Sequence, residues 1–361
     1  MKPRPVRLGM AGCGRAASSL HLPALTRLPE FEVVAVADPD PDRSAAAADR
    51  FSIPSCYAGY EALLEDPDVE AVAVCVPPEL HAEVAVEVMA SGKHLFLEKP
   101  LASSLEEGDR VLEAARASGA TAMLGLNLRW HPLVRRAHES IRAGSLGPIR
   151  LIHTTFTSAI AARGPLPAWR RDRGRGGGVL FEVATHHFDL WHHLSGAEVE
   201  EVFAWSRSID GHDDVATATA RLSDGSLAVG SFSQRTAGRN EIEIQGDRAR
   251  LSFSCYAFDG PHVVSTALPA GSPVERIRRA IRTLRDLPVA VGAARRGGVF
   301  RSSYAHEWRH FAECVRRGRE PSPGLADGYR ALRVTLAGVE SAKSGHPVRL
   351  DEPAAGSEAH G

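Results

Sequence analysis

The stretch "GGGVLFEVATHHFDLWHHL" at residues 176–194 gathers side chains that can exchange protons into a segment with the pattern of a buried helix. A helical wheel at about 100° per residue separates these side chains into two sets. One set is a polar line made up of Glu182, His186, Asp189 and His193. The other is an apolar stripe made up of Val179, Leu180, Val183, Leu190, Trp191 and Leu194. The polar line therefore borders the buried face, where a ligand cleft is expected.

Glu182 precedes His186 by one helical turn, near enough for the carboxylate to orient the imidazole and fix its tautomer. A general base requires this arrangement. His187 lies within the apolar stripe, and we expect a hydrogen-bonded core histidine there, whereas His192 points away and should be solvated. Zinc ligation is the competing interpretation of this helix. We expect no metal, because the H-E-x-x-H pattern is absent and no cysteine or third histidine has ligand spacing.

Two further segments carry residues suited to substrate contact. "FLEKPLA" places Glu98, Lys99 and Pro100 at the end of an apolar strand, where a lysine can hold a substrate hydroxyl or stabilise negative charge on its oxygen. An ordinary loop lysine is the alternative. "WRRDRGR" leads into the glycines at 176–178, and it could close over a polar substrate with Trp169 as a wall and Arg170 or Arg171 as a clamp. A solvated surface loop is the alternative for this segment.

The first apolar strand runs into "GCGRAA", which satisfies G-x-G-x-x-G/A with Gly12, Gly14 and Ala17. The first glycine permits the tight turn, the second lets a pyrophosphate approach the backbone, and the helix amino terminus faces the phosphates. Asp38 closes the second strand, where a carboxylate accepts hydrogen bonds from a ribose diol. Because that carboxylate would repel a 2′-phosphate, NAD is favoured. NADP stays an alternative through Arg43, one turn into the next helix.

Hydrophobic periodicity predicts the strands and helices that would position these residues. Residues 5 to about 125 alternate short β-branched runs with alanine-rich helical patterns, which predicts a doubly wound parallel sheet in an α/β domain over 1–125. Residues 126–350 show strand-like runs with turn residues, then helical patterns near 272–297, 303–317 and 325–344. These predict an α+β domain with a large, mainly antiparallel sheet. Residues 351–361 read as a polar tail.

Composition excludes several classes of protein. The 43 basic and 44 acidic residues among 361 leave almost no net charge, so we expect no nucleic-acid partner. The five cysteines are scattered and odd in number, which favours a reducing cytoplasm. The sequence has no signal-like apolar start and no run long enough to span a membrane. A basic amphipathic pattern over 275–287 suits a surface helix packed on its domain or at a subunit interface, with membrane or partner binding left open.

Taken together, the motifs resemble the Gfo/Idh/MocA oxidoreductases along essentially the whole chain. The resemblance rests on "GCGRAASSLHLPAL", "CVPPELHAEVAVEVMASGKHLFLEKPLA", "GLNLRWHP", "GSLGPI", "GGGVLFEVATHHFDL" and "DGYRALRVTLAGVESAKSGHPVRL". It implies a Rossmann domain, a carboxy-terminal domain with an open sheet, and homodimers or homotetramers built through that sheet. It also implies that Lys99 and His186 are catalytic. Family members often have aspartate at the position of Glu182 and glycine at that of Ala184, so the carboxylate here reaches one methylene group further.

This resemblance implies oxidation of a secondary alcohol of a sugar or cyclitol, or the reverse reduction. His186 would take the hydroxyl proton and Lys99 would polarise that oxygen, so both are expected to act on one bound alcohol. We expect the cofactor to contact Gly12, Cys13, Gly14, Arg15, Ala16, Ala17, Asp38, Arg43, Val76, Pro77, His81, Glu98 and Lys99. We expect the substrate to contact Lys99, Asn127, Arg129, Trp169, Arg170, Glu182 and His186. A redox-neutral NAD-dependent glycosidase and a non-catalytic nucleotide-bound sensor or scaffold are the alternatives.

Overall fold

The computed structural model describes residues 4–164, 166–269, 271–295 and 298–350, and it divides into two compact units. The first unit contains the chain up to Pro132 together with Gly174–Gly176 and Gly292–Leu332, and the second contains the rest. We expected one boundary near residue 125. The first unit is instead discontinuous, because part of the carboxy-terminal chain packs on its sheet. The predicted tail at 351–361 lies outside the described residues.

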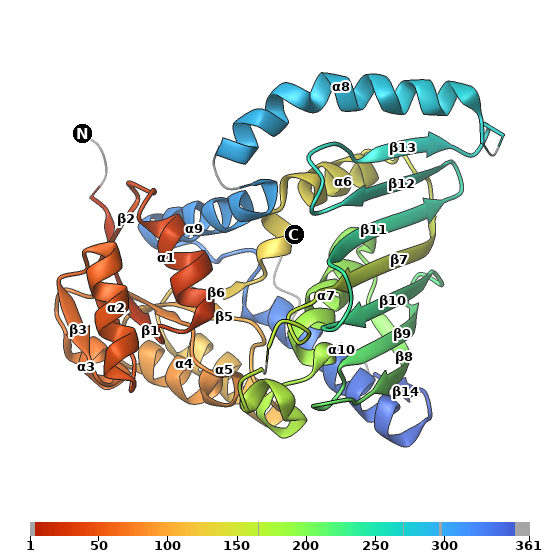
Figure 1. Ribbon diagram of the computed structural model, residues 1–361. Helices are drawn as coiled ribbons and strands as arrows, with labels where there is room; N and C mark the ends of the chain where they lie inside the picture. The colour runs from red at the N-terminus through yellow and green to blue at the C-terminus, as the bar shows by residue number, and fades with distance from the viewer. Residues whose placement is uncertain (1–3, 165, 270, 296–297, 351–361) are drawn as a thin grey trace. The chain divides into compact units, whose positions relative to one another are not determined.

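The first unit is built on a six-stranded parallel sheet with strand order β3-β2-β1-β4-β5-β6 (Figure 1). Its strands are β1 (Val6–Ala11), β2 (Phe31–Ala37), β3 (Ser55–Tyr57), β4 (Ala71–Val74), β5 (His94–Glu98) and β6 (Ala122–Gly125). The order reverses next to β1, so β1 and β4 flank the point where doubly wound sheets bind ligands. The expected α/β fold is confirmed. Only β3 was missed, because this short edge strand has no buried residue to give it an apolar pattern.

Helices cover both faces of this sheet. They are α1 (Leu22–Leu25), α2 (Pro41–Phe51), α3 (Tyr60–Glu65), α4 (His81–Ala90), α5 (Leu105–Ala117) and α9 (Val299–Arg317), with short turns η1 (Ala17–His21), η2 (Pro78–Leu80) and η3 (Asn127–Trp130). One core joins Leu8, Met10 and Phe96 of the sheet to Leu22 of α1 and Trp308 of α9. The helix predicted near residues 303–317 therefore completes the core of the first unit.

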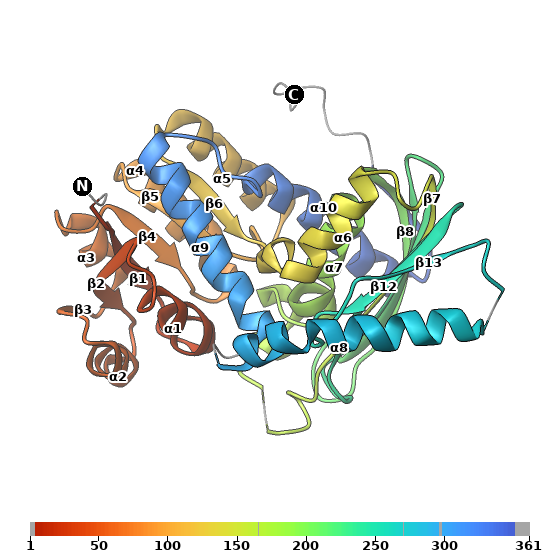
Figure 2. The ribbon, with the colours of Figure 1, turned by 90° about the horizontal axis from the view of Figure 1, so that it is seen from above.

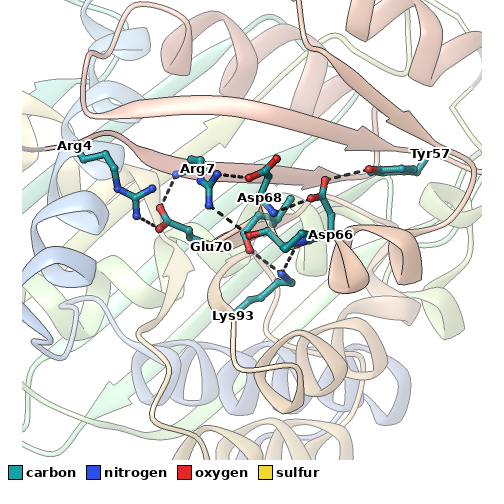
Figure 3. Close-up of polar contacts among 9 residues, drawn as sticks. Arg4, Arg7, Tyr57, Asp66, Asp68, Glu70 and Lys93 are labelled. Carbon is teal, nitrogen blue, oxygen red and sulfur yellow. Dashed lines mark hydrogen bonds and ion pairs between the residues drawn. The ribbon is translucent and has the colours of Figure 1, made fainter.

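A polar network lies at the amino ends of β1, β4 and β5, opposite the edge where a ligand is expected, and it extends to the hydroxyl of Tyr57, the last residue of β3 (Figure 3). Arg7 donates its backbone N–H to Glu70 at 3.0 Å, and Tyr57 donates its hydroxyl to Asp66 at 3.0 Å. Lys93 is buried, and its Nζ donates to the carbonyl oxygens of Asp66 at 2.8 Å and Val69 at 2.7 Å. The ammonium therefore ties the loop before β4 to the start of β5.

Replacing Lys93 with methionine should lower the free energy of unfolding by about 2 kcal/mol, because two carbonyl oxygens lose a charged donor. Urea denaturation followed by circular dichroism measures this change. The matched control is Lys343→Met, since Lys343 is exposed and should shift stability by less than about 0.5 kcal/mol. Equal losses in both variants would show that the Lys93 hydrogen bonds contribute nothing.

The second unit is built on an eight-stranded sheet with strand order β13-β12-β11-β7-β10-β9-β8-β14. Its strands are β7 (Ile149–Thr157), β8 (Val199–Arg207), β9 (Val215–Leu222), β10 (Leu227–Ser233), β11 (Arg239–Gly246), β12 (Ala249–Ser254), β13 (His262–Ser265) and β14 (Val348–Arg349). Only the β7–β10 pairing is parallel, so the expected mainly antiparallel sheet is confirmed. Buried alanines alternate with exposed threonines along β9, as expected when one face of a sheet is covered.

Helices cover that buried face. The helical elements assigned wholly or partly to this unit are α6 (Pro132–Arg142), η4 (Trp169–Arg171), η5 (Arg173–Arg175), η6 (Leu180–Ala184), α7 (Thr185–Ser195), α8 (Pro273–Arg295) and α10 (Leu325–Ser344). Trp191 of α7 donates its indole N–H to Thr154 of β7 at 3.1 Å, and Ser341 of α10 accepts from the backbone N–H of Ala204 at 2.9 Å. These bonds fix α7 and the second part of α10 against the sheet.

The predicted basic amphipathic segment forms part of α8, which runs beside β13 in Figure 1 and Figure 2. Its apolar side chains are exposed, with Ile277 60%, Ile281 59% and Leu284 68% accessible. Thr283 ties the helix to Asp259 through a hydrogen bond of 2.7 Å. The stripe therefore does not pack on the described part of its own domain, and packing at a subunit interface, the other expectation, stays a prediction. None of the helices in the described ranges is long and apolar enough to cross a membrane.

Candidate functional site

The turn after β1 has the geometry that a dinucleotide requires. Gly12 has φ +90°, and a Cβ there would lie 2.6 Å from the carbonyl oxygen of Cys75. At Gly14 an added Cβ would meet no atom within 4 Å, so space is open at the residue expected to face the pyrophosphate. Helical structure begins directly afterwards, with the Ser18 N–H donating to the Gly14 carbonyl at 2.9 Å. The two positions therefore need glycine for different reasons. The fold requires Gly12, whereas Gly14 leaves room for a ligand.

Asp38 follows β2 beside this turn. Its Oδ2 accepts the Cys13 N–H at 2.8 Å and its Oδ1 accepts the Asp40 N–H at 2.9 Å, so the carboxylate is fixed at the glycine turn. Each oxygen keeps a second lone pair for a ribose hydroxyl. Arg43 pairs with Asp40 at 3.1 Å, and its side chain is 62% exposed. The NADP alternative rested on this arginine, which the structure shows as an exposed helix charge.

His81 braces the loops that follow β4 and β5. Its Nδ1 lies 2.6 Å from the Pro100 carbonyl oxygen, and its Nε2 lies 3.0 Å from the Val76 carbonyl oxygen. The ring is buried, and burial lowers the pKa of His81 although both carbonyls oppose the shift. Both ring nitrogens therefore face the loop backbone. His81 supports these two loops, and a direct contact between its ring and a cofactor stays a prediction.

Glu98 and Lys99 stand at the carboxyl end of β5, as predicted. Lys99 is half-buried, and its backbone N–H donates to Glu98 Oε2 at 3.1 Å. Glu98 Oε1 lies 2.6 Å from His21 Nε2. Burial alone would raise the pKa of Glu98, but the hydrogen bond to His21 and the charge of Lys99 outweigh it and hold that pKa below its usual value. An ionised carboxylate and a cationic amine thus share one strand end.

Asn127 and Arg129 lie on η3, directly after β6. Both are buried. Asn127 Nδ2 donates to Ser303 Oγ at 3.2 Å, and Arg129 Nη2 donates to Asp327 Oδ1 at 3.0 Å. We expected both side chains to face the substrate or the nicotinamide. The bonds show that each ties η3 to the carboxy-terminal part of the first unit, so direct substrate contact by either stays a prediction.

Gly177, which precedes the predicted catalytic helix, is required for packing. A Cβ on Gly177 would lie 2.2 Å from the Trp169 carbonyl oxygen and 2.6 Å from that of Arg170, so only glycine fits against η4. Arg170 lies over the Trp169 ring with its Cζ 5.3 Å from the centroid. Its Nε pairs with Glu182 Oε1 at 2.8 Å. The predicted loop arginine is thereby held next to the predicted catalytic helix.

The helical wheel fails at the start of that helix. Leu180–Ala184 forms a π-helix, whose turn is wider than an α-turn, so the α-helical spacing from Glu182 to His186 does not apply. Glu182 Oε2 accepts from Gln234 Nε2 at 3.0 Å, a partner directly after β10 that the wheel did not indicate. Asp189, expected on the polar line, is buried. The apolar stripe is confirmed, while the support of His186 by Glu182 stays a prediction.

His187 is a core residue, as expected. It is fully buried between Phe156 and Phe232, at centroid distances of 5.4 Å and 5.9 Å. Neither ring nitrogen has a hydrogen-bond partner by geometry among the described residues, so the expected bond is missing, although Asn240 is its polar neighbour. Burial lowers the pKa of His187 to about 3, and Asn240 acts in the opposite direction. The folded protein therefore holds this imidazole neutral.

This burial makes stability depend on pH. The unfolded chain binds a proton at His187 near the ordinary pKa of 6.5, and the folded chain only near 3, so stability is lost as the pH falls from 6.5 toward 3. The free energy of unfolding of wild type relative to His187→Phe should fall by up to about 1.4 kcal/mol per pH unit in this window. Urea titrations from pH 7 to 4.5 measure it. His346→Phe, at an exposed histidine, is the control, and parallel curves for all three proteins would refute a neutral buried His187.

Several residues of these sites were missed by the sequence patterns. Arg173 makes a bidentate ion pair with buried Asp213, which holds the loop before the glycines. Asp327 and Gln234 are the partners of Arg129 and Glu182. Two of these residues had a visible signal, since Arg173 lies in the "WRRDRGR" loop and Asp327 in the "DGYRALRV" motif, although neither was assigned a role. The described residues include no group of three or more His, Cys, Asp or Glu side chains placed to hold a metal.

The parallel sheet, the glycine turn and the placed Asp38 define a dinucleotide-binding protein with a second, sheet-based unit. Sequence comparison gives the particular family. Residues 6–126 match the family described as "Oxidoreductase family, NAD-binding Rossmann fold", and residues 134–252 match the "GFO/IDH/MocA C-terminal domain". The chain belongs to the Gfo/Idh/MocA oxidoreductase family. NAD is accordingly its cofactor, and the glycine turn and Asp38 fit that group.

Relatives span nearly the whole chain. The dTDP-3,4-didehydro-2,6-dideoxy-alpha-D-glucose 3-reductase of Actinomadura kijaniata is 32% identical over 328 residues, which cover 90% of this chain and 92% of the relative. The myo-inositol 2-dehydrogenase of Thermotoga maritima is 27% identical over 96% of this chain and 99% of its own. A levoglucosan dehydrogenase solved with NADH and L-sorbose has the same fold, with a TM-score of 0.82, 22% identity and coverage of 97% and 100%.

Proposed function

We propose that this NAD-dependent oxidoreductase transfers hydride between nicotinamide and a secondary alcohol, or the corresponding ketone, of a sugar or cyclitol. The use of NAD is supported above all by Asp38, whose carboxylate is fixed at the glycine turn by the Cys13 N–H at 2.8 Å. The substrate half is supported by relatives named for an inositol and for a deoxysugar nucleotide. Charged and amide side chains at the strand end and on the loop, among them Lys99, Asn127 and Arg170, suit a polyol better than an apolar compound.

His186 and Lys99 share the proposed proton chemistry. Lys99 holds the reacting oxygen and stabilises negative charge on it, because its amine stands half-buried at the end of β5. His186 accepts the hydroxyl proton as general base, or returns it in the reduction. Glu182 orients the loop arginine and supports the imidazole. Bound NAD supplies the hydride acceptor, and NADH supplies the donor in the reverse direction.

Assembly and location are part of the same proposal. We place the enzyme in the cytoplasm, supported by five cysteines that are all free thiols. We further propose a homodimer or homotetramer through the second sheet. Its support is the outer face of that sheet, where Trp205 of β8 is 59% exposed and Leu227 of β10 is 51% exposed. Large apolar side chains at such exposure are typical of interaction surfaces when they lie on one face.

A substrate panel tests the function directly. Inositols, hexoses, anhydrosugars, amino sugars and nucleotide sugars are incubated separately with NAD and with NADP, and nicotinamide absorbance is followed. We expect NAD-linked turnover of at least one polyol, with NADP weaker because Asp38 repels its 2′-phosphate. Cleaved sugar without net NADH would establish the glycosidase alternative. Nucleotide binding without any turnover would favour the sensor or scaffold.

A further inference from the structure

Trp308, His21 and Glu98 form a buried chain of hydrogen bonds, called here the relay, which no sequence motif indicated. Trp308 of α9 donates its indole N–H to His21 Nδ1 at 3.2 Å, and His21 Nε2 lies 2.6 Å from Glu98 Oε1. Trp308 and His21 are fully buried. The His21 ring is enclosed edge-to-face by Phe96, Tyr304 and Trp308 at centroid distances of 5.6, 5.2 and 5.6 Å. The ring therefore has one orientation.

This geometry fixes the proton on His21. An indole nitrogen can only donate, so His21 Nδ1 must accept and carries no hydrogen. The remaining imidazole hydrogen lies on Nε2, and it is donated to Glu98. His21 is thus a neutral donor with a fixed tautomer, and Glu98 is the ionised acceptor. The second oxygen of Glu98 accepts the Lys99 N–H at 3.1 Å, so each carboxylate oxygen has one bond to the protein.

A second carboxyl group lies beside this relay. Glu307 precedes Trp308 on α9, is fully buried, and has no hydrogen-bond partner for either oxygen among the described residues. Burial and the negative charge of Glu98 raise the pKa of Glu307 well above its usual value. Two adjacent carboxylates in an apolar environment cannot both ionise readily. One of the pair therefore keeps its proton, and Glu98 is the one with donors for the charged form.

We propose that Trp308 and His21 are positioning residues that hold Glu98 ionised and in one orientation at the strand end where NAD is expected, while Glu307 stays protonated so that only one of the two carboxyl groups is charged. The inference rests on the proposed function, because it assigns Glu98 to the cofactor. Glu98 ends β5, and ligands of such sheets bind at the carboxyl ends of the strands. Besides Glu307, the ionisable groups around Glu98 are His21, Lys99, His81 and Cys75.

Binding of NAD across pH tests the relay. His21→Leu removes the donor, so Glu98 should take up a proton near neutral pH, and NAD should bind about tenfold more weakly at pH 6 than at pH 8. His21→Gln keeps an amide donor and should restore most of the affinity at pH 6. Wild type should change less than about twofold over this range. A purely structural role for His21 would weaken binding equally at both pH values and would overturn the proposal.

The indole donor has a matched control in the same unit. Trp308→Phe removes an N–H that donates to His21 but keeps a ring to stack on Phe96, whereas Trp130→Phe removes a buried indole N–H with no partner among the described residues. We expect the pH-dependent loss of NAD affinity only in Trp308→Phe, measured by calorimetric titration. The same dependence in both variants, or in neither, would overturn the role of Trp308.

The proton on Glu307 is observable without cofactor. Difference infrared spectra of wild type and Glu307→Gln at pH 8 should show a protonated-carboxyl carbonyl band in wild type alone. Absence of that band would overturn the proposed charge state. If wild type bound neither NAD nor NADP, the proposed function would fail on its own. The infrared band would still decide the Glu307 part, since it needs no bound nucleotide.

Discussion

Replacement of His186 by alanine should lower kcat for the NAD-linked reaction by about 10²- to 10⁴-fold, the usual contribution of a positioned general base. Lys99→Met should cause a loss of similar size, because the reacting oxygen then has no cationic partner. The double variant should be little worse than either single one, because the proposal assigns both groups to one proton transfer. Steady-state kinetics with the best substrate from the panel measures these changes, and calorimetry should show NAD affinity within about threefold of wild type for His186→Ala.

The control for this series lies on the same helix. His192 is part-exposed and pairs with Glu198 at 3.4 Å, away from the predicted proton path. His192→Ala should leave kcat within about twofold of wild type. If turnover survived unchanged in both Lys99→Met and His186→Ala, the assignment of the reacting groups would be wrong, whatever the family membership.

Gly14→Ala should abolish most NAD binding without destabilising the fold. The added methyl group meets no protein atom within 4 Å, so the free energy of unfolding should stay within about 0.5 kcal/mol of wild type. The same methyl occupies the space through which the pyrophosphate approaches the backbone, and we expect affinity to fall at least about tenfold. Calorimetric titration with NAD and urea denaturation measure the two effects separately.

Gly12→Ala is the informative counterpart of this variant. Its Cβ would lie 2.6 Å from the Cys75 carbonyl at φ +90°, so the backbone must move, at a cost of at least about 2 kcal/mol in stability. Gly12→Ala should therefore lose both stability and NAD affinity, whereas Gly14→Ala loses affinity alone. A stable Gly14→Ala protein with normal NAD affinity would place the pyrophosphate elsewhere.

Most of the fold was predictable from local pattern. Five strands of the parallel sheet and the central strands of the second sheet lie where alternation and turn residues put them, and α8, α9 and α10 lie where helical periodicity returned. The helix α5 begins as its sequence indicates, since Ser104 accepts the Glu107 N–H at 3.2 Å and Glu107 accepts the Ser103 N–H at 2.9 Å. The edge strands β3, β13 and β14 were missed, because strands of two to four residues with at most one buried residue contain no apolar repeat.

The candidate site was predictable in part. Gly12, Gly14 and Asp38 could be assigned because their motif spans one strand-turn-helix unit and a fixed offset to the next strand. The partner of Glu182 could not, because the wheel assumes an α-helix and the chain forms a π-helix at Leu180–Ala184. Arg129 was predicted to face the substrate from the family resemblance, and Arg170 from its residue type in a basic loop. Their carboxylate partners, Asp327 and Glu182, became visible only in the folded chain.

The amino-acid sequence by itself determined the two-part architecture, the nucleotide turn and the family, because periodicity, caps and turn chemistry are properties of residues a few positions apart. Tertiary structure alone decided which buried side chains face one another. His21 and Trp308 are 287 residues apart in the chain, yet they share a hydrogen bond of 3.2 Å beneath Glu98. Such a pair is created by the packing of α9 on the first sheet, and no local pattern contains the information that specifies it.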